Sequence, residues 1–151
     1  MKLLDTISDK NNNQIDIYSS KLALSPAFSL ILRTYAEIVE KKLAPPHINL
    51  DNTDSVIWAQ RNDGTILGGI CYKFGDKEDW NSAYIQLSFT ADSSRGLGIN
   101  ALCHPYLEQD AKSSGYTRVM SMVHVNNQAR LRSAEKVGLK PMFYVMYKQI
   151  K

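Results

Sequence analysis

Short runs rich in apolar residues, one of which alternates with polar positions over residues 14–18, dominate the first half of the chain, and such runs are typical of β-strands. Two of them flank Asn62-Asp63-Gly64, whose residues tolerate the positive φ of a hairpin turn. One segment has the spacing of a helix instead, because apolar residues recur on one helical face from Ser25-Pro26 to Pro45-Pro46. The pattern predicts one helix between these two sites and strands over residues 14–18, 55–60, 65–74 and 83–90.

In the second half of the chain, predicted strands alternate with predicted helices. Apolar residues from Ile99 to Leu107 share one helical face, although Pro105 is expected to kink or divide this helix. Gly138 ends a second helical run, and the pattern predicts a helix over 127–137 and strands over 117–125 and 142–150. The order of these elements predicts an α+β fold, a mixed sheet with helices on both faces in three layers.

The composition is that of a folded domain. With 151 residues, 44% hydrophobic and 22% charged, the chain can bury one core, and we expect a single domain over residues 1–151. This composition excludes a disordered tail and a collagen-like repeat. No run reaches the roughly 18 apolar residues of a membrane span, and no signal-peptide core begins the chain, so we expect a cytoplasmic protein without membrane contact. Cys71 and Cys103 are interpreted as buried free thiols.

The net charge of +3 is only a small excess of basic over acidic residues, so charge is informative only where it is local. Basic residues gather in the last third of the chain, where they form either a solvated helix face or a site for a phosphorylated ligand. No basic patch is interleaved with aromatic residues, so we expect no nucleic-acid partner. No cluster of His, Cys or Asp has the spacing of metal ligands, so we expect no metal.

The stretch from Ser94 to Ala101 carries two glycines between a predicted strand and a predicted helix. Glycines there let the backbone approach a ligand, and the free N–H groups of the new helix point at an anion such as a pyrophosphate. The stretch lacks the Gly-Lys-Ser/Thr ending of a P-loop. It spells the dinucleotide pattern G-x-G-x-x-A, but no acidic residue ends the next strand and too little chain follows for that fold. A turn without a ligand is the remaining alternative.

Two blocks of the sequence resemble the GNAT superfamily of N-acetyltransferases. Arg95-Gly96-Leu97-Gly98-Ile99-Asn100 is similar to its acetyl-CoA signature, Arg/Gln-x-x-Gly-x-Gly/Ala. Asn127 to Leu139 is similar to its second block, an asparagine followed by a helix that ends in Glu-Lys-x-Gly-Phe. The resemblance covers residues 54–150 and implies a mostly antiparallel GNAT-like sheet. It also implies an enzyme that moves the acetyl group of acetyl-CoA to a primary amine by direct attack in a ternary complex.

The resemblance further implies where acetyl-CoA binds. In this superfamily the strand before the glycine loop splays from its neighbour, pantetheine lies in the V-shaped gap against strand backbone, and the loop amides hold the pyrophosphate. Asn127 would face the cofactor, and Arg130 would either reach a phosphate or be merely solvated. The implied cofactor-binding residues are Leu87, Phe89, Arg95, Gly96, Leu97, Gly98, Ile99, Asn100, Asn127 and Arg130.

The chain departs from the superfamily pattern where catalysis is concerned. Ala134 stands where many members carry a tyrosine that protonates the departing thiolate, Asn100 stands in place of Gly or Ala, and the strand 83–89 contains no acidic residue. A histidine suits base work near neutrality. The expected catalytic residues are His124 as base, Tyr84 as a substrate-binding or proton-relay group, and Tyr147 as thiolate acid.

The acceptor and the activity itself leave alternatives open. The missing acid–base residues also suit a non-enzymatic CoA-binding adaptor domain. The acceptor is expected to be an amine of a protein or of a small molecule. An open groove suits a protein lysine, whereas Asp76, Glu78 and Asp79 could give the acidic lining that suits a polyamine or an aminoglycoside. The chain is expected to act as a monomer or a homodimer.

Overall fold

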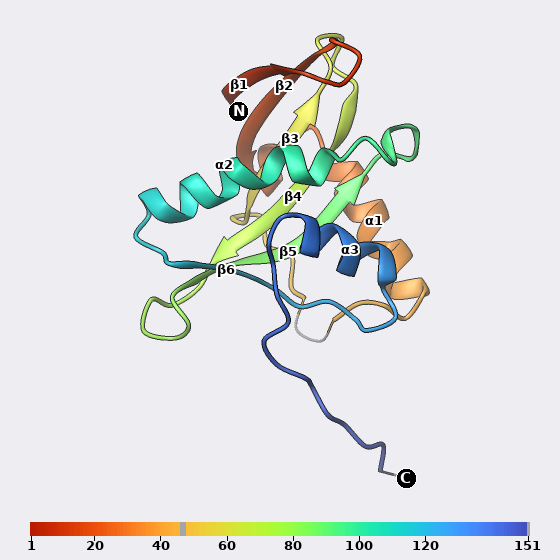
Figure 1. Cartoon of the computed structure of the whole chain (residues 1–151), viewed down its shortest axis with the longest axis vertical. Coiled ribbons are helices and arrows are strands. Elements are labelled where there is room, and N and C mark those ends of the chain that lie inside the picture. The colour runs from red at the N-terminus through yellow and green to blue at the C-terminus, as the bar shows by residue number, and fades with distance from the viewer. Residues whose placement is uncertain (46–47, 151) are drawn as a thin grey trace.

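Six strands lie in one sheet in the order of the sequence, as Figure 1 shows for the computed structural model, which describes residues 1–45 and 48–150. Neighbouring strands are antiparallel except β5 and β6, which are parallel. The strands are β1 (Lys2–Ser8), β2 (Gln14–Lys21), β3 (Ser55–Gln60), β4 (Ile66–Phe74), β5 (Ser82–Thr90) and β6 (Arg118–Ser121). The helices are η1 (Leu22–Leu24), α1 (Phe28–Glu40), η2 (Asp92–Ser94), α2 (Ile99–Ser113) and α3 (Gln128–Lys136). The predicted α+β fold with a mixed, mostly antiparallel sheet is confirmed.

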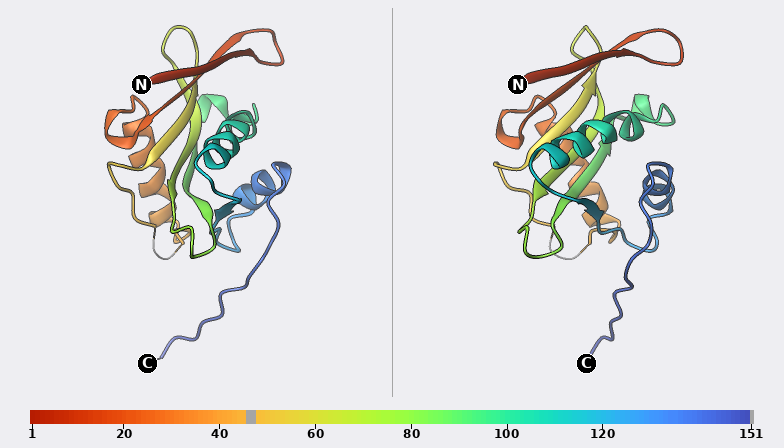
Figure 2. Two further views of the ribbon diagram at one scale, coloured as in Figure 1. Left: turned by 90° about the vertical axis from the view of Figure 1, so that its left-hand side faces the viewer. Right: turned by 60° about the vertical axis from the view of Figure 1, so that its left-hand side comes forward.

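Helices cover both faces of the sheet, which Figure 2 shows from two further directions. On one face, Ile31 of α1 is buried with Trp58 and Phe89 of the sheet. On the other face, Leu107 of α2 is buried with Ile85, and α3 lies against α2. Successive side chains of a strand point to opposite faces, so the alternating strands of the sequence supply both cores. The predicted three-layer arrangement is confirmed.

The two cysteines are free and buried, one in each core. Burial raises the pKa of the Cys71 thiol and of the Cys103 thiol to about 12. The interpretation as buried free thiols is therefore confirmed. Because the thiolate is the reactive form of cysteine, both side chains are poor nucleophiles near neutral pH.

The helices differ from the prediction at two proline sites. Ser25 does not begin α1 but closes a turn before it, since its Oγ accepts a hydrogen bond from the Ala27 N–H at 3.1 Å. The helix ends at Glu40, ahead of Pro45, and Pro46 lies outside the described residues. Helix α2 runs through Pro105 unbroken, so the expected division is wrong. Pro105 is exposed, and so is Ala101, whose carbonyl loses its helical partner, so this carbonyl is open to solvent.

Three strands differ from the prediction. The strand predicted over 117–125 is shortened to β6, and the strand predicted over 142–150 is wrong, because this segment is extended, exposed and without a neighbouring strand in the described chain. A strand needs a neighbour to satisfy its backbone groups. β1 was not predicted, because Leu3, Leu4 and Ile7 do not alternate, and a bulge between Leu3 and Asp5 restores its pairing with β2.

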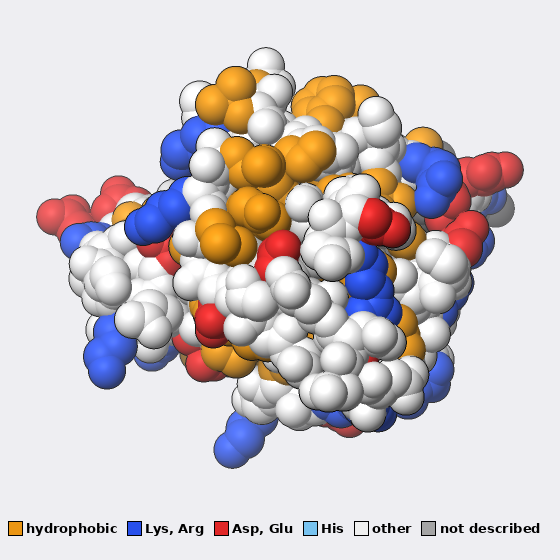
Figure 3. All heavy atoms as spheres, turned by 90° about the horizontal axis from the view of Figure 1, so that it is seen from above, with side chains coloured by type: hydrophobic (Ala, Val, Ile, Leu, Met, Phe, Trp, Pro, Cys, Tyr) orange, Lys and Arg blue, Asp and Glu red, His pale blue; other side chains and the backbone are white. Residues whose placement is uncertain are grey.

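One face of the molecule mixes charges. Seen from above in Figure 3, Lys and Arg side chains lie among acidic and apolar ones rather than forming a face of one sign. None of the helices described is long and apolar enough to pass through a bilayer.

Candidate active site

The parallel strands β5 and β6 separate half-way along β5. They pair from Ser82 opposite Arg118 to Ile85 opposite Ser121, where the described pairing ends. β5 continues to Thr90, whereas the chain after β6 turns toward α3 (Figure 1). The sheet therefore opens into a V-shaped gap between these two strands.

A β-bulge in β5 lies at the same level. Tyr72 of β4 opposes Ile85 and Cys71 opposes Leu87, so Gln86 has no partner on β4. The bulge reverses the faces of the residues after it, because Ile85 lies in the core under α2 and Leu87 in the core under α1. Beyond the bulge, the backbone edge of β5 that β6 leaves unpaired faces the gap.

The gap opens into a cavity of about 570 Å³. Its walls come from the second half of β5, the glycine loop with the start of α2, the segment after β6, and α3, and α1 adds Thr34 and Glu37. Two polar atoms of lining residues, Ser88 Oγ and Asn100 Oδ1, are buried without a hydrogen-bond partner in the described chain. Buried polar atoms almost always have partners, so these two favour a polar ligand in the cavity.

The glycine loop forms one end of the cavity. Gly96 has a φ of 82°, and Gly98, which precedes the first residue of α2, has a φ of 70°. The first hydrogen bond of the helix runs from Leu102 N–H to the Gly98 carbonyl, so the amides of Ile99 and Asn100 have no acceptor inside the helix. A Cβ at either glycine would meet no atom within 4 Å, which leaves the approach to these amides open. Such a helix start binds phosphate oxygens well.

The remaining predicted loop and strand residues differ in their positions. Arg95 lines the cavity, but its guanidinium already pairs with the Asp92 carboxylate at 3.2 Å. The Leu97 amide is used within the loop, where it donates to a carbonyl of η2 at 3.3 Å, and its side chain is not part of the wall. Leu87 lines the cavity, whereas the Phe89 side chain is buried in the core under α1.

α3 brings a half-buried positive charge to the cavity. Asn127 caps this helix, since its Oδ1 accepts from Arg130 N–H at 3.2 Å. The Arg130 guanidinium donates to Ser133 Oγ at 3.1 Å and to Ser121 Oγ at 3.3 Å, and no carboxylate of the described chain forms an ion pair with it. Burial lowers the pKa of Arg130, but an arginine stays a cation in proteins. A half-buried cation with only hydroxyl partners favours an anion beside it.

His124 lies in the segment after β6 and lines the cavity. Its Nδ1 accepts a hydrogen bond from Asn126 N–H at 3.0 Å. Because Nδ1 is an acceptor, the neutral ring carries its proton on Nε2. The ring is therefore set up as a hydrogen-bond donor, and it acts as a base only after it gives up the bond to Asn126.

The two predicted tyrosines do not line this cavity. Tyr84 lies on β5 before the bulge with its ring beside Gly75, and burial raises its pKa. Tyr147 is 86% exposed in the segment 142–150. The structure thus brings His124 together with the glycine loop and Arg130, but neither tyrosine.

The acidic residue in the wall is a different one from those considered in the sequence. Asp76, Glu78 and Asp79 lie in the loop between β4 and β5 and are not part of the cavity. Glu37 of α1 is the one carboxylate among the described residues that line it. No sequence signal distinguishes Glu37, because a glutamate on an exposed helix face is ordinary; only the packing of α1 beside β5 places it here.

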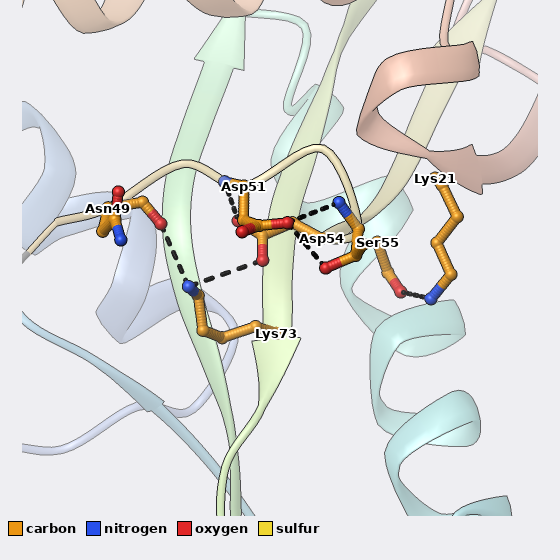
Figure 4. A network of polar contacts seen from close by, with 7 residues as sticks. Lys21, Asn49, Asp51, Asp54, Ser55 and Lys73 are labelled. Carbon is orange, nitrogen blue, oxygen red and sulfur yellow. Dashed lines mark hydrogen bonds and ion pairs between the residues drawn. The ribbon is translucent and has the colours of Figure 1, made fainter.

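A second, smaller cavity of about 270 Å³ lies beside β3 and β4, where Figure 4 shows a network of polar contacts. Lys73 Nζ donates to the Asn49 carbonyl at 3.0 Å and lies 3.5 Å from the Asp54 carboxylate. The same carboxylate accepts from Asp51 N–H at 3.0 Å. Hydrogen bonds from Thr53 lower the pKa of Asp51. Since each acid has its own partners, this network holds the loop after α1 against the sheet.

The described residues contain no group of three or more His, Cys, Asp or Glu side chains that could hold a metal ion. The polar groups of the larger cavity are instead amides, hydroxyls, one imidazole, cations and the single Glu37 carboxylate. Such a set binds anionic and amide-containing molecules.

Comparison with known proteins gives one family and many similar folds. Residues 24–139 match the family model of the acetyltransferase (GNAT) family. Curated protein sequences give no significant match. The structure is similar to that of an aminoglycoside acetyltransferase from an uncultured soil metagenomic sample, with a TM-score of 0.66, 17% identity, and coverage of 91% of this chain and 97% of the other.

Two further structures have the same fold. A ribosomal-protein-alanine N-acetyltransferase from Brucella melitensis biovar Abortus 2308 has a TM-score of 0.65 at 14% identity, with 90% of this chain and 99% of the other covered. A putative acetyl transferase from Pyrococcus furiosus has a TM-score of 0.64 at 20% identity, with 89% and 99% covered. At these identities the likeness concerns the fold.

Proposed function

Because the chain belongs to the GNAT acetyltransferase family, we propose that it transfers the acetyl group of acetyl-CoA to a primary amine in the cavity between β5 and β6. The observation that carries this proposal is the separation of the two strands beside the start of α2. One cavity then offers an unpaired strand edge for an extended amide chain and a helix start for phosphates. We also propose a cytoplasmic location, because free buried cysteines are typical of reducing compartments.

The walls divide the binding of acetyl-CoA between two elements. The amides of Ile99 and Asn100 would hold the pyrophosphate, with Arg95 near it at the rim. The backbone edge of β5 after Gln86 would pair with the amide groups of pantetheine, as a strand does with a neighbour. Ser88 Oγ and Asn100 Oδ1 would then gain the partners that they lack.

In the transfer, the amine nitrogen attacks the thioester carbonyl carbon, the C–S bond breaks, and the sulfur leaves as a thiolate. The Nε2–H of His124 is the donor available to polarise the carbonyl oxygen, and the amine proton passes to water. Base work by His124 itself requires release of the Asn126 bond. Neither cysteine takes part, since both thiols are buried with a pKa of about 12.

The charge that favours the departing thiolate comes, in this proposal, from Arg130. Ala134, at the position of the tyrosine in many members, is buried and offers no hydroxyl. Arg130 lies one turn earlier on the same helix, and its guanidinium reaches Ser121 at the point where β5 and β6 separate. A half-buried cation stabilises a thiolate electrostatically without transferring a proton.

The acceptor amine would enter beside α1. The Glu37 carboxylate is in this wall, and it attracts an amine in its ammonium form. Among the proteins of similar fold, one is an aminoglycoside acetyltransferase and another a ribosomal-protein-alanine N-acetyltransferase. We propose a primary amine of either a small cationic molecule or a protein as the acceptor.

A CoA-binding adaptor without transferase activity is the second candidate. Two observations favour it, the alanine at position 134 and the absence of an acidic residue along β5. It keeps the cavity and the glycine loop but makes no product.

Thermal unfolding with acetyl-CoA tests the binding part of the proposal. A ligand that binds only the native state adds about 2.7 kcal/mol at 100 times its Kd. We expect acetyl-CoA to raise the melting temperature and NADH and ATP to leave it nearly unchanged. No shift with acetyl-CoA would contradict the assigned cavity.

Release of free thiol from acetyl-CoA with a panel of amines tests the transfer. The panel includes a polyamine, an aminoglycoside, a lysine peptide and an alanine N-terminal peptide. Amine-dependent release supports the transferase, whereas a melting shift without release supports the adaptor.

A further inference from the structure

Helix α2 buries one polar side chain beside its apolar ones. His104 is only 4% exposed, and the other buried residues of α2 are Ile99, Cys103, Leu107 and Ala111. The Nε2 atom of the imidazole is buried and has no hydrogen-bond partner in the described chain. Because a buried polar atom without a partner costs free energy, Nε2 indicates a partner that the packed side chains themselves do not supply.

A second buried atom without a partner lies one turn earlier on α2. Asn100 and His104 are four residues apart and share one face of the helix, and Asn100 Oδ1 also lacks a hydrogen-bond partner in the described chain. Side chains of a helix lean toward its N-terminus, so the imidazole covers the turn of Asn100. Its Nδ1 lies 3.5 Å from the Glu108 carboxylate, one turn later. Since the two ring nitrogens point in nearly opposite directions, Nε2 is turned away from Glu108, toward the turn of Asn100.

Both atoms are hydrogen-bond acceptors. The Glu108 carboxylate favours a proton on Nδ1 of His104, which leaves the lone pair of the neutral ring on Nε2. The oxygen of the Asn100 amide can only accept. Two acceptors cannot bond to each other, so the space beside them requires a donor.

Arg130 of α3 brings donors to this space. α3 lies against α2 (Figures 1 and 2), and Arg130 is close enough to His104 for its charge to lower the pKa of the imidazole. The guanidinium donates to Ser133 and to Ser121, and further N–H groups remain on it. It makes no direct hydrogen bond to Asn100 Oδ1 or to His104 Nε2. A small molecule that both donates and accepts is needed to connect the three groups.

We propose that a buried water molecule between α2 and α3 donates one hydrogen bond to Asn100 Oδ1 and one to His104 Nε2, and accepts one from the Arg130 guanidinium. A buried water typically makes about three hydrogen bonds to polar groups that otherwise lack partners. An amide oxygen has two lone pairs, so Asn100 Oδ1 can accept from this water and from a bound substrate at the same time.

The water makes His104 a positioning residue for Arg130. Through it, α2 holds the guanidinium in addition to Ser121 and Ser133, at the point where β5 and β6 separate. This role rests on the proposed function, in which Arg130 faces the departing thiolate. The water site itself does not depend on that function.

The tautomer of His104 tests the water site without a measurement of activity. ¹⁵N chemical shifts of the imidazoles at about pH 8, where a free imidazole is neutral, show which nitrogen carries the proton. We expect Nδ1–H for His104 and the opposite tautomer, Nε2–H, for His124, whose Nδ1 accepts from Asn126. The variants His104→Gln and His124→Gln assign the signals. A proton on Nε2 of His104 would overturn the proposal, because Nε2 could then accept no hydrogen bond.

A crystal structure of the chain tests the water itself. We expect a water within hydrogen-bond distance of Asn100 Oδ1, His104 Nε2 and the Arg130 guanidinium, and we expect His104→Leu to lose it. An empty site, or a direct bond from Arg130 to His104 Nε2, would overturn the proposal.

Steady-state kinetics test the positioning role. We expect His104→Leu to lower kcat about tenfold or more and to leave the KM for acetyl-CoA nearly unchanged, because a small displacement of a group beside the reacting atoms costs this much. His104→Gln keeps an acceptor at a similar reach and should regain most of kcat. Cys103→Ala, at the neighbouring buried residue, is the matched control, since it loosens the same helix and should keep kcat. A kcat of His104→Leu equal to that of the parent would overturn the positioning role.

The pH profile of kcat separates positioning from a structural role. Glu108 and Arg130 are the charged groups that act on His104, whose pKa lies below the ordinary 6.5. A proton on Nε2 turns this acceptor into a donor beside a cation, so kcat of the parent should fall below that pKa, and His104→Gln should remove this fall. The same fall in both proteins would overturn the positioning role. If acetyl-CoA binds but no amine releases thiol, the proposed transfer fails, and the ¹⁵N shifts and the crystal structure still decide on the water.

Discussion

Gly98 is the residue on which the proposed phosphate site depends most directly. Its φ of 70° strains any residue with a side chain, and β-branched residues most, by about 1–2 kcal/mol. A side chain here also stands beside the free amides of α2. We expect Gly98→Val to weaken acetyl-CoA binding about tenfold or more, as measured by calorimetry.

A matched control separates strain from loss of the site. Gly64 has a φ of 89° in a hairpin turn, and a Cβ at this position, as at Gly98, would meet no atom within 4 Å. Gly64→Val should therefore lose similar stability and keep its affinity for acetyl-CoA. Equal affinities of the two variants would remove the glycine loop from the binding site.

Arg130 is expected to act on the reaction more than on binding. Its guanidinium is held by Ser121 and Ser133 where β5 and β6 separate, and it has no carboxylate partner in the described chain. Removing a donor that stabilises developing charge costs about 100-fold in kcat. Arg130→Met should show this loss with a smaller change in KM for acetyl-CoA, while Arg132→Met, on the exposed side of α3, keeps its activity. A rise in KM alone would instead place Arg130 at a phosphate.

Among the secondary-structure elements, β3 and β5 were predicted almost to the residue. β5 alternates along most of its length, whereas β3 is a run of four apolar residues that is buried on both faces. β1 was missed because a bulge interrupts it, so that its apolar residues do not alternate with polar ones. The segment 142–150 has the pattern of a strand, but a pattern cannot show whether a partner strand is present.

Helix α2 carries a buried histidine that makes the stability of the protein depend on pH. Burial lowers the pKa of His104, and its Nδ1 lies 3.5 Å from the Glu108 carboxylate, which opposes this shift less strongly. Arg130, which lowers the pKa further, is the other charged group that acts on it. Since the folded pKa lies below the ordinary value of 6.5, the unfolded chain binds more protons as the pH falls through this value. The contribution of His104 is therefore complete above pH 6.5 and is lost on acidification.

We expect the free energy of unfolding, measured with urea, to fall between pH 7 and pH 5, and His104→Gln to make this fall smaller. Glutamine stays neutral in this range and fills a similar volume. Other groups of the fold set the slope that remains. The same slope in His104→Gln and in the parent would show that His104 does not titrate differently in the folded state.

In the molecule as a whole, the glycine loop and the asparagine block were recognisable because each is continuous in the sequence. Glu37, Ser121 and the bulge at Gln86 were not, since they reach the cavity only through the packing of α1 and the separation of β5 from β6. The orientation of His124 was also not predictable from the sequence. Its hydrogen bond to Asn126 is a local contact, but which nitrogen it uses is decided by the turn after β6.

The cavity is walled by α1 on one side and by α2 and α3 on the other, so both substrates can occupy it together. Neither buried cysteine can accept the acetyl group, because with a pKa of about 12 the thiolate fraction at pH 8 is about one in 10⁴. This agrees with the proposal that transfer passes through a ternary complex. We expect initial-rate plots against either substrate to intersect, and iodoacetamide at pH 8 to leave the activity intact while it labels the unfolded chain. Parallel plots, or an enzyme that keeps the label of acetyl-CoA when no amine is present, would point instead to a covalent acetyl-enzyme.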